Sequence, residues 1–176
     1  LVYLCEYYNL PEVANYWEQV VIINEYQNRR FVRKIIKNMF NTVSGKKIAI
    51  FGFAFKADTG DTRESPAIYI SKWLLEEQAE IAIYDPKALK NAKKDLEGVK
   101  GKIQYFNDPY ECARYAHAIA IITDWREFRD YDYKRIFDSM IKPAFLFDGR
   151  NILDPKEMHK IGFNVFPLGS GNLTYL

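Results

Sequence analysis

Short apolar runs alternate with amphipathic stretches from Lys46 to the end of the chain. Apolar runs rich in Ile, Ala and Phe predict buried strands, and the stretches between them predict helices. The expected strands are Ile48–Phe51, Glu80–Tyr84, Ile103–Phe106, Ala118–Ile122, Ala144–Phe147 and Phe163–Phe166. The expected helices are Ala67–Glu77, Leu89–Leu96, Pro109–Ala116, Tyr133–Ser139 and Pro155–Ile161. This alternation predicts an α/β fold with a doubly wound, parallel, Rossmann-like sheet. The run Ala118–Ile122 should lie centrally, and Phe163–Phe166 should form an edge.

A long α-helix is expected before the sheet, from Pro11 to about Phe40, with a length of roughly 40 Å at 1.5 Å per residue. Its apolar stripe recurs at steps of three and four residues and includes Val13, Trp17, Val20, Val21, Asn24, Phe31, Ile35 and Met39. Its other face is basic, with Arg29, Arg30, Arg33, Lys34 and Lys37, and we interpret it as a solvated face. Such a helix exceeds the needs of one small domain, so it should bridge two domains or pack against a second subunit. We expect a helical segment over residues 1–43 and a Rossmann-like domain over residues 44–176.

The stretch Lys46–Pro66, KKIAIFGFAFKADTGDTRESP, contains the first strand, a glycine, a long loop and the start of a helix. Thr62 or Arg63 should lie in the cap region of this helix, and Pro66 in its first turn. Strand, glycine turn and helix together place a helix N-terminus where an anion can bind. Two phenylalanines replace glycines of the G-x-G-x-x-G fingerprint, so a standard dinucleotide grip is not expected. Lys56 and Arg63 either offer their charges to an anion or are incidental cations of a solvated loop.

Polar residues also follow the other predicted strands, at the edge where ligands of doubly wound sheets bind. Asp85 closes the second strand and is either the acid that binds a ribose hydroxyl or a turn residue that ends the strand. Thr123 and Asp124 follow the fourth strand. Arg150 follows the fifth strand in the sequence DGRN, and its guanidinium fork suits a phosphate group.

Composition narrows the function classes. The net charge is +2, which is too small to indicate a nucleic-acid partner. Cys5 and Cys112 are the only cysteines and are interpreted as reduced core thiols of a cytoplasmic protein, without a neighbouring His or Lys to activate them. His117 and His159 lack partners at metal spacing, so no metal site is expected, and His117 should be a hydrogen-bonded residue at the edge of the core. No apolar run is long enough for a membrane span, and no signal peptide is predicted.

Several long motifs resemble one enzyme family. They are GFAFKADTGDTRESPAIYISKWL, DPYECARYAHAIAIITDW, KPAFLFDGRNILD and NLPEVANYWEQVVIINEYQNRRF. The first three are similar to the C-terminal, UDP-binding domain of the UDP-glucose 6-dehydrogenases, and the fourth is similar to their central linker helix. The resemblance covers nearly the whole chain, in order.

The resemblance implies an NAD-dependent enzyme that oxidises UDP-glucose to UDP-glucuronate. It implies that Phe55 and Lys56 contact the substrate, that Arg150 binds the phosphates of UDP, and that Arg63 reaches the pyrophosphate of NAD across an interdomain cleft. Lys56 and Arg150 are expected to bind the same UDP-sugar from adjacent strand ends. It also implies homo-oligomers formed through the long helix. The family's catalytic Cys and its NAD-binding domain precede the part that this chain matches. We therefore expect a fragment, with no catalytic residue of its own and no activity alone.

The sequence leaves other interpretations of the function open. Sibling enzymes that act on GDP-mannose or UDP-N-acetylmannosamine share the architecture. A non-catalytic nucleotide-sugar-binding or oligomerisation module is compatible with the absence of a nucleophile, although the chain begins in the middle of an apolar helix and without Met. An independent dinucleotide-binding domain is disfavoured by the two phenylalanines.

Overall fold

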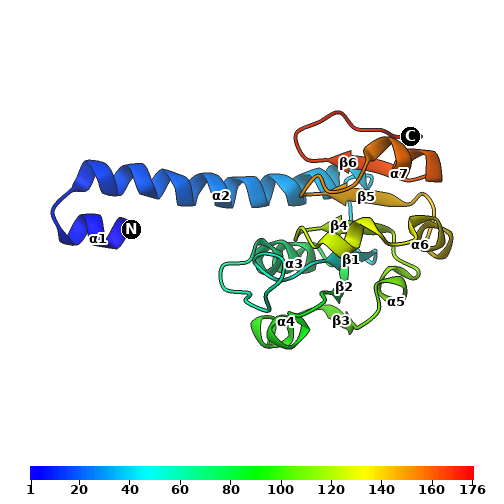
Figure 1. Ribbon diagram of the computed structural model, residues 1–176, viewed down its shortest axis with the longest axis horizontal. Helices are drawn as coiled ribbons and strands as arrows, with labels where there is room; N and C mark the ends of the chain where they lie inside the picture. The colour runs from blue at the N-terminus through cyan, green and yellow to red at the C-terminus, as the bar shows by residue number, and fades with distance from the viewer.

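The structure is a computed structural model that describes residues 1–176, and Figure 1 shows an α/β domain from which a long helix projects. The strands are β1 Lys47–Phe51, β2 Glu80–Tyr84, β3 Lys102–Phe106, β4 Ala118–Ile121, β5 Phe145–Asp148 and β6 Asn164–Pro167. The helices are α1 Val2–Tyr7, α2 Pro11–Asn38, α3 Pro66–Glu76, α4 Leu89–Asp95, α5 Pro109–Ala113, α6 Tyr133–Ser139 and α7 Pro155–Ile161, with a 3-10 turn, η1, at Arg126–Arg129. All the predicted strands and helices are present, with ends that differ by a few residues.

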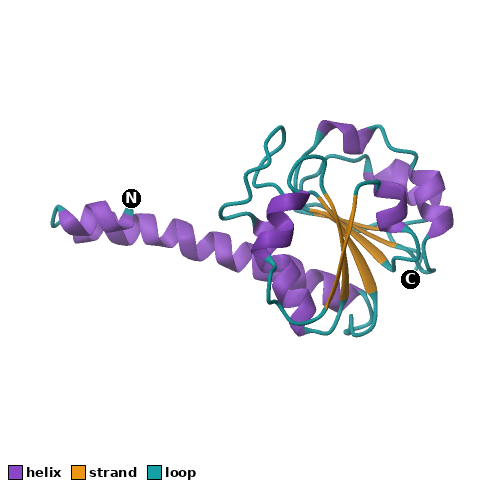
Figure 2. Ribbon diagram, turned by 90° about the horizontal axis from the view of Figure 1, so that it is seen from below, coloured by secondary structure: helices purple, strands orange, loops and turns teal.

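The strands form one parallel sheet in the order β3-β2-β1-β4-β5-β6. This order confirms the doubly wound fold, with β4 in the interior of the sheet and β6 at an edge. The direction of winding reverses between β1 and β4, which is where ligands bind in folds of this kind. Figure 2 shows helices on both sides of the strands, as crossover connections of one hand require.

Each face of the sheet packs against its own hydrophobic cluster. Ile48 and Ile50 of β1 belong to one cluster, and Ala49 and Phe51 belong to the other. Neighbouring residues alternate between the clusters because successive side chains of a strand point to opposite faces. Both faces are therefore apolar, which explains why the strands appear in the sequence as continuous apolar runs.

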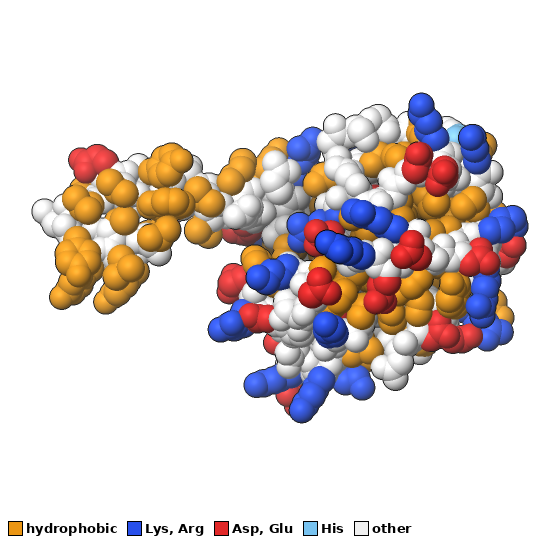
Figure 3. Space-filling model, in the orientation of Figure 1, with side chains coloured by type: hydrophobic (Ala, Val, Ile, Leu, Met, Phe, Trp, Pro, Cys, Tyr) orange, Lys and Arg blue, Asp and Glu red, His pale blue; other side chains and the backbone are white.

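Helix α2 has 28 residues, about 42 Å at 1.5 Å per residue, and its two halves have different surroundings. Phe31, Val32 and Ile35 of its C-terminal half are buried in the core of the domain. Its N-terminal half projects from the domain, and α1 folds back beside it (Figure 1). We call α1 together with residues 11–23 the arm. Figure 3 shows apolar side chains gathered on it. Val20 and Val21 are among the exposed apolar residues of this segment.

The proposed boundary between residues 43 and 44 remains a prediction, and the hydrophobic core draws on both sides of it. None of the helices is long and apolar enough to cross a membrane.

Two local expectations are wrong. The cap of α3 is neither Thr62 nor Arg63 but Ser65, whose side-chain oxygen accepts a hydrogen bond from the N–H of Ala67 at 3.3 Å. Pro66 is the first helical residue, as predicted, because its missing N–H is not needed there. Cys5 was expected to be a core thiol, but α1 buries none of its residues, and Cys5 is only half-buried.

Candidate functional site

The turn after β1 is packed tightly against the turn after β4, at the topological switch point, where the direction of winding reverses. Gly52 has a φ of +88°, and a Cβ at this position would lie 2.5 Å from Cβ of Thr123 and 2.8 Å from its backbone nitrogen. The Thr123 hydroxyl donates a hydrogen bond to the carbonyl of Ala54 at 2.7 Å. Only glycine fits at position 52, because any side chain would both strain the backbone and collide with Thr123, in the turn after β4.

Asp85 follows β2, and its carboxylate holds this turn through hydrogen bonds. Its side chain is buried and accepts hydrogen bonds from five N–H groups. One carboxylate oxygen, Oδ2, accepts from the backbone of Phe53 at 2.6 Å, the backbone of Ala54 at 2.9 Å and the indole of Trp125 at 3.2 Å. The other oxygen, Oδ1, accepts from the backbone N–H groups of residues 87 and 88, at 2.8 and 2.7 Å.

These hydrogen bonds decide between the two interpretations of Asp85. Both of its oxygens are occupied, so the residue ends the strand and holds the loop, and it does not bind a ribose. The first amides of the β1 turn, those of Phe53 and Ala54, also point at Asp85 and are not free for a pyrophosphate. Phe53 itself is fully buried in the core. The structure therefore agrees with the expectation that this turn does not grip a dinucleotide in the usual way.

The loop beyond this turn carries three of the predicted site residues at the surface. The Phe55 side chain is 49% exposed, and Lys56 is also exposed. The backbone N–H of Phe55 donates to the carbonyl of Asp61 at 2.8 Å, which closes the loop on itself. The Arg63 guanidinium binds the Asp61 carboxylate at 2.6 Å, and this hydrogen-bonded contact lowers the pKa of Asp61 to about 2. Arg63 is thus exposed but already paired, whereas Lys56 has no carboxylate partner.

Arg150 is held in place at the end of β5. Its Nε donates to the carbonyl of Ile122, and its backbone N–H donates to the buried carboxylate of Asp148 at 2.9 Å. Asp148 also accepts from the backbone of residues 152 and 153, so it organises this loop much as Asp85 organises the other. The remaining guanidinium nitrogens of Arg150 bind no carboxylate. Such an arginine is oriented but keeps donors for a ligand.

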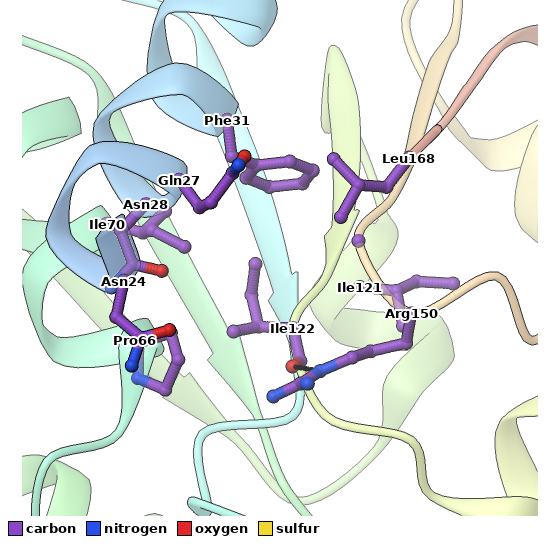
Figure 4. Close-up of a pocket in the computed structure, with 11 residues that line it drawn as sticks. Asn24, Gln27, Asn28, Phe31, Pro66, Ile70, Ile121, Ile122, Arg150 and Leu168 are labelled. Atoms are coloured by element: carbon purple, nitrogen blue, oxygen red, sulfur yellow. Dashed lines mark hydrogen bonds between the residues drawn. The ribbon is translucent and has the colours of Figure 1, made fainter. Parts of the chain in front are cut away.

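A cavity of about 210 Å³ lies beside Arg150, between α2, the start of α3 and the ends of β4 and β5. We call it the Arg150 cavity, and Figure 4 shows its lining side chains. They are Asn24, Gln27, Asn28, Phe31, Pro66, Ile70, Ile121, Ile122, Gly149, Arg150 and Leu168. The three amides of α2 form one wall, and the rings and aliphatic groups form the rest. Gly149 allows its loop to lie close to β4 and α2, because a Cβ there would lie 2.8 Å from the carbonyl oxygen of Ile121 and 3.3 Å from the Phe31 ring.

The sequence pointed to Arg150 but not to the amide wall. The only signal was the polar Asn24 within the apolar stripe of the helix. Lys56 and Arg150 were expected to act from adjacent strand ends, and this expectation is wrong because β4 lies between β1 and β5. Phe55, Lys56 and Arg63 do not line the Arg150 cavity.

Burial shifts the pKa values of Cys112 and His117. Cys112 is fully buried, and burial raises the pKa of its thiol. Lys47 lies near enough to oppose this shift, a neighbour that the sequence did not reveal, but burial has the larger effect. His117 accepts a hydrogen bond from the backbone of Lys47 at 3.1 Å, as expected for a residue at the edge of the core, and burial lowers its pKa.

Comparison with known proteins agrees with this architecture. The sequence model of the "UDP-glucose/GDP-mannose dehydrogenase family, UDP binding domain" matches residues 49–155. The chain is 52% identical to the UDP-glucose 6-dehydrogenase of Drosophila melanogaster, with 96% of this chain and 38% of that protein covered. It is 50% identical to UDP-glucose 6-dehydrogenase 2 of Oryza sativa subsp. japonica, with 96% of this chain and 39% of that protein covered.

Among solved structures, a UDP-glucose dehydrogenase from the archaeon Pyrobaculum islandicum has a similar fold. The TM-score is 0.72 at 23% sequence identity, over 94% of this chain and 34% of the other. The chain thus spans about two fifths of the length of the curated relatives that it matches. The matched family model covers the switch point, the loop after Gly52 and the loop that holds Arg150. The chain therefore belongs to the UDP-glucose/GDP-mannose dehydrogenase family and contains its UDP binding domain.

Proposed function

We propose that the chain is the UDP-sugar-binding part of an NAD-dependent UDP-glucose 6-dehydrogenase, which oxidises UDP-glucose to UDP-glucuronate. The observation that carries this proposal is sequence identity of about half to UDP-glucose 6-dehydrogenases, across almost the whole chain. The oxidation of a primary alcohol to a carboxylate removes four electrons. Two NAD molecules would each accept a hydride, and they would be held mainly by a domain outside this chain.

Arg150 is proposed to bind the UDP phosphates. Its Nε is fixed by the Ile122 carbonyl, so its remaining donors keep one orientation toward the end of the sheet. A guanidinium fork held in this way matches two oxygens of a diphosphate at little further cost in side-chain entropy. The adjacent cavity, with its amide wall, offers hydrogen-bond partners to a polar part of the ligand.

The loop after Gly52 is proposed to supply the other contacts. Phe55 and Lys56 are exposed on a loop whose base is tied to Asp85, so they present an apolar ring and a free ammonium to the substrate. Arg63 is proposed to reach the NAD pyrophosphate. It would then exchange Asp61 for the cofactor or bind both, since the Asp61 carboxylate occupies its Nε and one terminal nitrogen.

The proposal also includes an oligomeric state and a cellular compartment. The apolar arm would pack against a second subunit, which would give a homo-oligomer, or against another domain of the full protein. Two unpaired cysteines fit a cytoplasmic protein, because thiols stay reduced there.

Calorimetric titration of UDP-glucose into the full-length protein tests the assignment. Arg150→Ala should weaken binding about tenfold to a hundredfold, because charge-assisted contacts to phosphate contribute roughly 1.5–3 kcal/mol. Arg114→Ala is the matched control, since Arg114 is exposed near the start of β1, at the opposite end of the sheet, where its carbonyl accepts from Lys47. Unchanged affinity in Arg150→Ala would reject the role of this residue.

Two alternatives are separated by the same samples. A sibling enzyme would bind GDP-mannose or UDP-N-acetylmannosamine more tightly than UDP-glucose. A non-catalytic nucleotide-sugar-binding or oligomerisation module would form no NADH from UDP-glucose even in the full-length protein. The buried Cys112, with its raised pKa, is the observation that favours this second alternative for the chain taken alone.

A further inference from the structure

A second cavity, of about 370 Å³, lies on the other side of Phe31 and Leu168, the two side chains that also line the Arg150 cavity. It is formed by the basic face of α2 and by the loop that follows β6. Figure 1 shows this loop passing the C-terminal end of α2. Its lining residues are Arg30, Phe31, Arg33, Lys34, Lys37, Asn38, Leu168, Gly169 and Asn172. We call it the basic cavity.

The four cations of the basic cavity stand at positions i, i+3, i+4 and i+7 of α2, which places them on one face of the helix. Like charges at this spacing destabilise a helix by a few tenths of a kcal/mol per pair. The helix dipole compensates only near the C-terminus, where Lys37 lies in the last turn. The dipole therefore does not explain the three cations that lie before the last turn.

No carboxylate neutralises this stripe. The lining contains no Asp or Glu, and none of the ion pairs of the chain involves Arg30, Arg33, Lys34 or Lys37. By contrast, Arg29, which lies outside the cavity lining, pairs with Glu25 at 3.0 Å. The basic cavity is therefore a concave surface with uncompensated positive charge.

One cation is fixed within this surface. The Lys34 ammonium donates to the carbonyl of Pro167 at 2.6 Å, which ties α2 to the loop after β6. Burial and the neighbouring Arg30 lower the pKa of Lys34, as expected for a cation among cations. A solvated face would leave all its side chains free, whereas here the loop closes one side of the stripe. The basic face was interpreted from the sequence as solvated, and its enclosure by residues 168–172 is visible only in the fold.

We propose that the basic cavity binds a small phosphate-bearing anion at a site separate from the proposed UDP-sugar site. A phosphate group brings several acceptor oxygens and a negative charge, which complement two guanidinium forks and two ammonium groups. The volume lies in the range of small-molecule sites. Arg150, Lys56 and Arg63 do not line this cavity, so the two sites share only the boundary formed by Phe31 and Leu168.

Titration of inorganic pyrophosphate into the full-length protein at about 0.15 M salt tests the proposal, with calorimetry as the readout. With UDP-glucose present at saturation to occupy the proposed UDP-sugar site, wild-type protein should bind one equivalent of pyrophosphate saturably. Arg33→Ala/Lys37→Ala should weaken this binding tenfold or more, because it removes two of the four cations. Lys90→Ala/Lys94→Ala is the matched control, since it removes two exposed lysines at i, i+4 spacing on α4 and changes the net charge equally. Its affinity should stay within about twofold of wild type.

The outcomes separate the proposal from its rivals. Absence of saturable pyrophosphate binding, or an equal loss in the two double variants, would overturn it, because the charge would then act without a site. Displacement of pyrophosphate by saturating UDP-glucose, together with loss of both in Arg150→Ala, would also overturn it and assign the cations to the UDP-sugar site. Titration of ADP identifies the source of the phosphate: affinity equal to that of pyrophosphate indicates the phosphates alone, and tighter binding indicates a nucleotide.

Thermal melts guard against misfolding. Arg33 and Lys37 are exposed, so the double variant should melt as wild type does. If it melts lower, the single variants Arg33→Gln and Lys37→Gln carry the same test, and each must still weaken pyrophosphate binding for the proposal to hold.

Discussion

Replacement of Asp85 by Asn tests how much the hydrogen bonds accepted by its carboxylate stabilise the loop of the candidate site. The change keeps the size of the side chain and removes one acceptor oxygen. In the native protein, three N–H groups converge on Oδ2 and two on Oδ1. The single oxygen of Asn can accept from either the set of three N–H groups or the set of two. Its NH₂ group must then face the other set, which contains at least two N–H donors.

The expected loss follows from the donors left without an acceptor. A buried donor without a partner costs about 1–3 kcal/mol, and water can rescue some of the five. Asp85→Asn should therefore lower the free energy of unfolding by about 2–4 kcal/mol, a large part of the 5–15 kcal/mol typical of a domain. For a chain of this length each kcal/mol shifts the melting temperature by about 2–4 °C, so a shift of about 5–15 °C is expected.

Urea unfolding followed by circular dichroism measures this loss. The matched control is Asp95→Asn, because Oδ2 of Asp95 is buried and accepts no hydrogen bond, so the same substitution there removes no bond. UDP-glucose affinity of the folded variant should also fall, since the Phe53 and Ala54 amides fix the base of the loop that carries Lys56. An Asp85→Asn protein as stable as wild type to within 1 kcal/mol would refute the role assigned to the carboxylate.

Other expected results follow from the same structure. The purified chain should form no NADH from UDP-glucose and NAD, because it lacks an activated nucleophile, and NADH above a no-protein control would contradict this. The chain should self-associate through the apolar arm, which light scattering at tens of micromolar would reveal, and a clean monomer would count against it. Lys56→Ala should weaken UDP-glucose binding about tenfold to a hundredfold in calorimetry. Arg150→Lys should bind UDP-glucose more weakly than wild type, because a point charge cannot reproduce a guanidinium fork. Wild-type affinity in either variant would show that the cation is only a solvated loop residue. Cys5 should react with a thiol reagent in the native chain, whereas Cys112 should react only after denaturation, because it is buried and its pKa is raised; equal reaction rates would show that the core opens readily.

The sequence by itself determined the elements and their character. Strands buried on both faces must be apolar throughout, so the runs around Ile48–Phe51 and Ala118–Ile122 were recognisable, and β4 could be placed in the interior of the sheet. Gly52 and Pro66 were equally recognisable, because a positive φ and a first helical position favour these residue types for local reasons. The loop cations Lys56 and Arg150 were found because they follow predicted strands.

Only the tertiary structure decided how these pieces meet. The carboxylate of Asp85 takes its donors partly from residues 31 and 32 positions away, and no local pattern specifies such a partner. The order of the strands placed β4 between the strands that precede Lys56 and Arg150. The packing of α2 against the domain brought Asn24 and Phe31 to the Arg150 cavity. Local periodicity encodes which side chains are buried, since burial depends on the face of an element. Which groups face one another across the fold depends on the packing of elements far apart in the sequence, and that packing emerges only when the whole core forms.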